Sequence, residues 1–119
     1  MVKKIIFVAA TLLSAATCVH ATTVCAGGAP NVVTPVTAQT PAQFIQVSFG
    51  PKCSNNVLLN YVETATSIGV GSVSTKGANK FQGSSNGGGI TSNGACAAAC
   101  SAESNATMNT IATTMSTAT

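Results

Sequence analysis

Four cysteines follow residue 21, and they constrain the fold of this chain more than any other feature. They are Cys25, Cys53, Cys96 and Cys100. An even number of cysteines in a short exported chain is typical of a disulfide framework, because an oxidising compartment preserves such bonds. We therefore predict two disulfides. All three pairings stay open, with a preference for Cys25–Cys53 because it would tie the N-terminal segment to the first predicted strands.

The evidence for export lies in residues 1–21. Two lysines come first, an uncharged apolar run covers residues 5–16, and short side chains at Val19 and Ala21 precede a predicted cleavage site. These are the three parts of a secretory signal peptide. The apolar run is shorter than the roughly 20 residues of a membrane-spanning helix, so we expect cleavage after Ala21 and no permanent membrane anchor. Cleavage after Ala16 is the alternative.

The charge that remains after residue 21 is small. Lys52, Lys76 and Lys80 stand against Glu63 and Glu103, which leaves a net charge of +1. A nucleic-acid interface needs clustered basic side chains that neutralise phosphates, and no such cluster is present in the sequence. We therefore expect no nucleic-acid partner.

The middle of the chain has the pattern of β-strands. Apolar and polar residues alternate over 44–49, and β-forming residues fill 57–64 and 68–75, the last with glycine at alternate sites. Phe81 marks a fourth strand, and Asn-Gly dipeptides supply turns. Turn signals every 8–12 residues or so favour a mainly β fold, a small antiparallel meander or sandwich of about four to six strands, stapled by disulfides. The expected core is thin. It comprises Phe44, Phe49, Leu58, Leu59, Tyr61, Ile68 and Phe81.

Two further segments flank this predicted β domain at 44–95. Residues 22–43 contain three prolines, so we expect an extended lead-in with at most an edge strand near Val32 and Val33. The Ala/Thr-rich segment 96–119 completes the chain as a helix or a disordered tail.

Opposing propensities act on the C-terminal segment. Alanines favour a helix, whereas β-branched threonines disfavour one, so we predict a short helix over 95–106 that fades into a disordered tail. Met108, Ile111 and Met115 recur at helical spacing, and we interpret this stripe as core packing.

The side chains missing after residue 21 exclude most catalytic chemistry. There is no Asp, Arg or Trp, and the one histidine, His20, belongs to the predicted signal peptide. Nucleophilic sites of the Ser-His-Asp and Cys-His types need an imidazole base. Glu63 and Glu103 are predicted to be solvated surface residues. Cys96 and Cys100 have a spacing that favours a structural bridge over thiol–disulfide exchange. We therefore expect no catalytic residue, no metal or cofactor site and no enzymatic activity.

These observations favour an exported, non-enzymatic protein of bacterial type. We expect a structural, adhesive or matrix component of the periplasm, cell surface or extracellular space, which meets protein partners or itself through sheet edges. The alternative is a small soluble secreted binding module or inhibitor that uses a disulfide-held loop such as residues 83–94. A long uncovered edge strand would favour the first function, and an exposed rigid loop the second.

Overall fold

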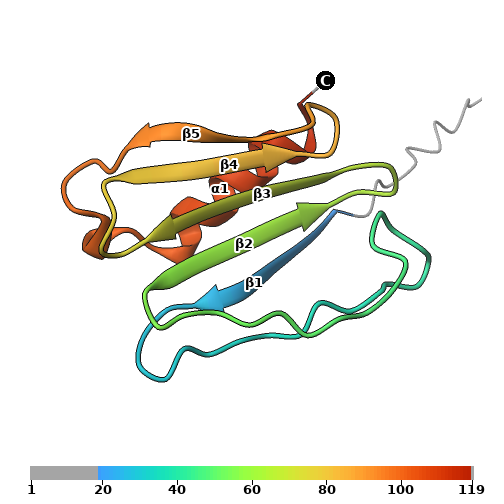
Figure 1. Cartoon of the computed structure of the whole chain (residues 1–119). Helices are drawn as coiled ribbons and strands as arrows, with labels where there is room; N and C mark the ends of the chain where they lie inside the picture. The colour runs from blue at the N-terminus through green and yellow to red at the C-terminus, as the bar shows by residue number, and fades with distance from the viewer. Residues whose placement is uncertain (1–18, 119) are drawn as a thin grey trace, which may run out of the picture.

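Five strands lie side by side in chain order and form one antiparallel sheet (Figure 1). The computed structural model describes residues 19–118. The strands are β1 (His20–Ala26), β2 (Val57–Glu63), β3 (Ile68–Ser74), β4 (Asn79–Ser84) and β5 (Ile90–Ala95). A 3₁₀ turn, η1 (Cys100–Ala102), and a helix, α1 (Asn105–Ser116), follow them. The predicted fold class, a mainly β antiparallel meander with disulfides and a C-terminal helix, is confirmed.

Helix α1 lies against one face of the sheet, over β2 and β3 (Figure 1). Two glycines of β3, Gly69 and Gly71, are buried beneath it. A methyl group on Gly69 would overlap the backbone of Ala112, and one on Gly71 would overlap the carbonyl of Met108. The absence of side chains at these positions therefore lets the helix backbone approach the strand directly.

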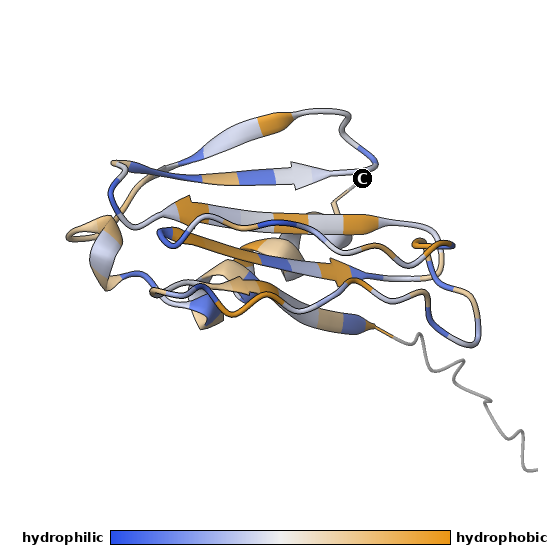
Figure 2. Cartoon of the chain, turned by 60° about the horizontal axis from the view of Figure 1, so that its bottom comes forward, coloured by the Kyte–Doolittle hydropathy of each residue, from blue (hydrophilic) through white to orange (hydrophobic). Residues whose placement is uncertain are grey.

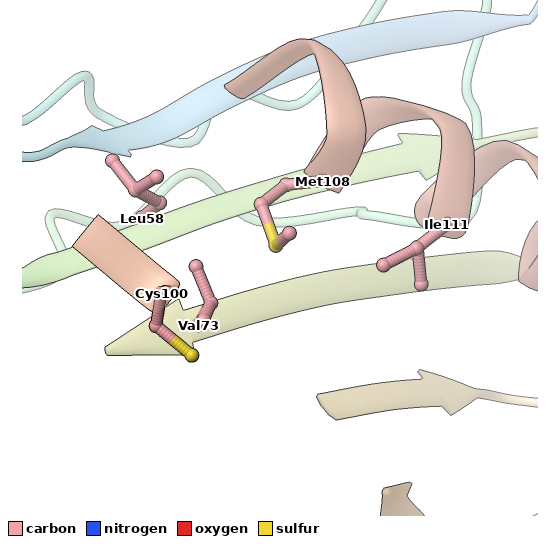
Figure 3. Close-up of a cluster of buried hydrophobic side chains, with 5 residues drawn as sticks. All are labelled: Leu58, Val73, Cys100, Met108 and Ile111. Atoms are coloured by element: carbon pink, nitrogen blue, oxygen red, sulfur yellow. The ribbon is translucent and has the colours of Figure 1, made fainter. Parts of the chain in front are cut away.

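A cluster of apolar side chains fills the remaining space between the sheet and α1 (Figure 3). It comprises Leu58, Val73, Cys100, Met108 and Ile111. Met108 is fully buried, and Met115 packs against the cluster from the last turn of α1. The predicted role of the helical Met/Ile stripe in core packing is confirmed.

The predicted position of the helix is wrong. The helix does not cover 95–106 but begins at Asn105, where the Ser104 side chain caps it by accepting a hydrogen bond from the Thr107 amide at 3.3 Å. The hydroxyls of exposed threonines donate to carbonyls four residues earlier, as Thr113 does to Asn109 at 2.8 Å, which satisfies these side chains within the helix. The cap and burial of the apolar stripe therefore override the low helix propensity of the threonines.

The opposite face of the sheet is partly covered by the long connection between β1 and β2. This covering segment, residues 27–56, runs over β2 and β3 on the side away from α1 (Figure 2). It contributes Val36 and Ile45 to a second apolar cluster around Tyr61. The Cys25–Cys53 disulfide fixes its C-terminal part to β1, which confirms the preferred pairing.

The predicted strand at 44–49 is wrong. Only Phe49 makes a ladder contact, an isolated bridge to Val36. The amide of Phe44 donates to the Thr64 carbonyl, and that of Ile45 donates to the Glu63 carboxylate. The backbone of this segment is thus bonded to the end of β2, and its alternating side chains do not define a buried face.

The apolar core differs from the expected one in its aromatic residues. Leu58 and Tyr61 are buried as predicted, whereas Phe44, Phe49 and Phe81 are more than two-fifths exposed. Valines of β1, β2, β3 and the covering segment take their place in the interior. These are Val24, Val36, Val62 and Val73.

The lead-in contains a strand that the sequence did not indicate. β1 begins at His20 and pairs with β2, whereas Val33 makes only an isolated bridge to Cys25. The predicted cleavage site after Ala21 therefore lies within β1. Residues 1–18, which make up most of the predicted signal peptide, lie outside the described part of the chain.

Candidate functional site

β5 forms one edge of the sheet, and all six of its residues are exposed. It pairs with β4 on its inner side. Within residues 19–118, no strand pairs with its outer side. The strand contains no charged residue and no proline, the two residue types that often protect sheet edges from pairing with other chains. The outer edge of β5 is therefore a set of backbone donors and acceptors open to another extended segment.

A β-bulge limits the regular part of this edge. Lys80 of β4 is opposite Gly94 and Phe81 is opposite Ser92, so Asn93 is an additional residue in β5. Gly94 has a φ of 95°, which a residue with a side chain rarely adopts. The bulge increases the local twist and leaves Ile90–Ser92 as the regular stretch.

The other edge of the sheet is covered. The Ala26 amide donates to the Val32 carbonyl at 3.0 Å, and the Thr34 amide donates to the Val24 carbonyl at 2.9 Å. Residues of the covering segment thus occupy the outer side of the C-terminal half of β1. The outer edge of β5 is therefore more accessible to another chain than the outer edge of β1.

Apolar side chains are exposed beside the β5 edge on the face away from α1. The register places Phe81 opposite Ser92, and Gly83 opposite Ile90. Ile90 is 69% exposed and Phe81 is 43% exposed. A shallow hollow of about 330 Å³ lies between Ile90 and β3. It is lined by Ile68, Val70, Gly83, Ser84, Ser85, Gly88, Gly89 and Ile90.

The segment 83–94 is not a loop closed by a disulfide. It comprises the end of β4, a glycine-rich turn and most of β5. The Cys96–Cys100 disulfide closes a short loop immediately after β5 and buries Cys100 in the cluster beneath α1. This bridge therefore anchors the C-terminal end of the edge strand and leaves the turn itself unconstrained.

Both glutamates have fixed partners, so the prediction of two solvated surface residues is wrong. Glu63 is fully buried, and its Oε2 accepts a hydrogen bond from the Ile45 amide at 2.9 Å. Glu103 forms an ion pair with Lys80 at 3.5 Å and is mostly buried. No sequence signal shows the burial of Glu63, because it depends on α1 and the covering segment lying on the two faces of β2.

The structure does not bring the two carboxylates together. Glu63 is opposite Ile68 at the start of β3, whereas Lys80, the partner of Glu103, is opposite Val73 near the end of that strand. Five residues along a strand correspond to about 17 Å. A glycosidase-type carboxylate pair needs a much shorter separation.

Within the described residues, no group of three or more His, Cys, Asp or Glu side chains is placed to hold a metal ion. No helix in that part of the chain has the length and apolar character needed to cross a membrane. No protein-family model, curated protein or solved structure matches the chain. The properties of the β5 edge therefore carry the functional argument.

Proposed function

We propose that this chain is an exported, non-enzymatic protein of bacterial type that acts as a structural, adhesive or matrix component and associates with itself through β5. The observation that carries the proposal is the uncharged, fully exposed edge strand with apolar side chains beside it. Two disulfides support export, because such bonds persist in oxidising compartments.

A second copy of the chain is the partner that suits this edge best. Two β5 strands in antiparallel orientation would exchange backbone hydrogen bonds about a two-fold axis, and their lack of charge removes any repulsion between identical strands. Ile90 of each copy would approach the face of the other, where Phe81 is also exposed. Pairing would thus bury both backbone groups and apolar surface.

The covered β1 edge limits the size of the assembly that association through β5 can form. Pairing of β5 with β1 of the next copy would require the β1 carbonyl and amide groups that residues 32–34 already engage. Association through β5 alone is isologous, and an isologous contact closes at a dimer. We expect a two-fold dimer with one continuous sheet as the assembly unit.

The proposed absence of catalysis follows from the side chains that the chain lacks after residue 21. General acid–base catalysis near neutral pH most often uses histidine. Glu63→Gln and Glu103→Gln should therefore each leave the biological activity nearly intact. A turnover assay in which either variant loses activity while its fold is retained would contradict this part of the proposal.

The oligomeric state of the exported protein tests the proposed association. We expect sedimentation velocity to show a concentration-dependent dimer for the wild type. The double variant Ile90→Lys/Ser92→Lys should be monomeric, because it places charges at the edge of each copy. A matched control, Thr110→Lys/Thr114→Lys, adds the same charge to the exposed side of α1 and should dimerise like the wild type. Equal dimerisation of all three proteins would overturn the proposal.

A monomeric wild type at every concentration would instead favour the alternative, a small secreted binding module. The hollow between Ile90 and β3 would then be the contact site. The glycine-rich turn beside it, residues 86–89, is exposed and would supply adaptable backbone contacts.

Processing is tested separately by the intact mass of the exported protein. We expect a chain that begins at Thr22, with a mass reduced by the hydrogens lost in two disulfides. A species that retains Met1, or free thiols that react with an alkylating reagent without prior reduction, would contradict the export proposal.

A further inference from the structure

An apolar cavity of about 120 Å³ lies between the covering segment and the sheet, on the face away from α1. β1, β2 and β3 form one wall, and the covering segment, which crosses these strands in Figure 2, forms the other. We call this space the apolar cavity. None of its lining residues precedes Thr22, so the proposed cleavage removes none of them. The lining residues that matter most here are Val36, Ile45, Phe49, Leu59, Ile68 and Val70.

The covering segment fills its face of the sheet less completely than α1 fills the other face. On β3, Val73 packs beneath α1 and is 1% exposed, whereas Ile68 and Val70 pack beneath the covering segment and are only partly buried. Leu59 of β2 is also only partly buried, although it belongs to the same apolar cluster. The apolar cavity is therefore space in this interface that the side chains of residues 19–118 leave unfilled.

The walls of the apolar cavity present no polar surface. Water inside it would lack the hydrogen-bond partners that hold buried water in place. Apolar cavities of about 150 Å³ in other proteins stay dry and bind benzene or xenon. An empty cavity also deprives its walls of dispersion contacts, which a bound hydrocarbon group would restore. A polar group would instead lose its hydrogen bonds to water, so the cavity favours a hydrocarbon group.

The apolar cavity adjoins the hollow of about 330 Å³ beside Ile90, because Ile68 and Val70 line both spaces. Together the two spaces reach the roughly 300–1,000 Å³ of a small-molecule site. The hollow is also lined by Ser84 and Ser85, whose hydroxyls can bond to a polar end group. A narrow apolar space that opens into a wider one with polar walls suits an elongated molecule with one polar end.

We propose that the apolar cavity binds the end of one unbranched aliphatic chain, with the rest of the chain and its polar end group in the adjoining hollow. Phe49 borders the cavity and is 55% exposed, which places an entry route at the outer wall. Among residues 19–118, no backbone hydrogen bond involves residues 50–52, so this stretch of the covering segment can move to admit the chain end. β4 and β5 contribute no residue to the cavity, so the inference does not depend on association through β5.

Binding of straight-chain alcohols tests this site. We propose to titrate the exported, disulfide-bonded protein with hexanol, octanol and decanol, and to follow the NMR signals of its methyl groups. We expect saturable binding of one molecule, with an affinity that rises about fourfold for each added methylene that is buried. The methyl signals of Val36, Leu59 and Val70 should shift, whereas those of Leu58 and Ile111 beneath α1 should not.

Val70→Phe should block the site, because Val70 lines both the cavity and the hollow and the variant places a ring there. We expect its affinity for decanol to fall about tenfold, the effect of excluding about two methylenes from the cavity. Val47→Phe is the matched control, because Val47 is 75% exposed and does not line the cavity. This control should bind decanol like the wild type. If Val70→Phe does not fold, the shifted methyl signals of the wild type locate the bound alcohol instead.

The inference would be overturned if no alcohol bound saturably, or if the wild type and folded Val70→Phe bound decanol equally. Methyl shifts confined to exposed side chains such as Ile90 would also overturn it. Membrane lipids carry aliphatic chains too, so flotation with phosphatidylcholine vesicles is measured in parallel. We expect no flotation, because the cavity takes one chain end. Flotation that Val70→Phe abolishes would assign the chain to a bilayer lipid and overturn the assignment to a free single-chain molecule.

Discussion

The two halves of the sheet differ in how completely they are covered. β2 and β3 lie between α1 on one face and the covering segment on the other. Five of the seven residues of β2 are buried, and they include Asn60 and Glu63. β5, at the opposite end of the meander, has every residue exposed (Figure 1).

The covered half of the sheet should provide most of the stability, whereas the exposed half leaves backbone groups open to another chain. Burial of apolar surface is the main stabilising contribution, so the half with β1, β2 and β3 should carry most of the free energy of unfolding. The half with β4 and β5 contributes less and can therefore present unpaired backbone and apolar side chains. Substitutions in each half test this difference.

The disulfides should give the largest difference between the two halves. Cys25–Cys53 spans 28 residues and holds the covering segment in place, whereas Cys96–Cys100 spans four. In the chain-entropy relation, replacing both cysteines by alanine costs about 3.5 kcal/mol for the long bridge and about 2 kcal/mol for the short one. Urea unfolding measures both values. If loss of the short bridge cost as much free energy of unfolding as loss of the long one, or more, the covering segment would add little to stability.

Disrupting the contact between α1 and β3 should have the next largest effect on the free energy of unfolding. In Gly69→Ala the new methyl group overlaps the helix backbone, so α1 must move away from the sheet. We expect a loss of about 3 kcal/mol in the free energy of unfolding. Gly87→Ala is the control, because nothing lies within 4 Å of a methyl group there. A Gly69→Ala protein as stable as this control would contradict the described helix position.

A substitution in the β5 bulge should have a smaller effect on stability. Gly94→Ala places a side chain at a φ of 95°, and we expect a cost of about 1 kcal/mol. Gly89→Ala, in the preceding turn and with open space around it, should change stability by less. Equal stability of the two variants in thermal unfolding would mean that β5 does not hold this bulge in solution.

The outer edge of β5 should have the smallest effect on the folded monomer. Ile90→Lys/Ser92→Lys changes exposed positions, so we expect its free energy of unfolding, measured below the dimerisation range, to lie within about 0.5 kcal/mol of the wild type. A loss of several kcal/mol would show that the two halves do not differ as described.

The local signals of the sequence predicted the meander but not what covers it. β2, β3 and β4 were predicted because their β-forming residues lie between short turns, and hairpins depend on local sequence. β1 was missed because its partner begins at Val57, some thirty residues later, and no local pattern reports such pairing. The strand predicted at 44–49 failed for the related reason that its amides bond to β2 and Thr64.

The sequence predicted that a sheet edge would be the functional surface, but it did not predict which strand forms that edge. A low charge and glycine-rich turns indicated an exposed sheet edge, but β5 itself was missed, because its glycine-rich and polar sequence was interpreted as part of a loop over 83–94. That β5 and not β1 is the open edge depends on where residues 32–34 lie. The burial of Glu63 depends on the path of the covering segment, which no periodicity describes.

The order of elements has a consequence for the time course of folding. β2, β3, β4 and β5 are joined by short turns and can pair as hairpins within microseconds or so, without waiting for distant residues. β1 contacts β2 across the long covering segment, and closing such a loop carries a larger entropic cost. If the chain is exported N-terminus first, as proposed, its first strand emerges before the partner of that strand. We expect β1 to dock last and Cys25 to remain a free thiol until then.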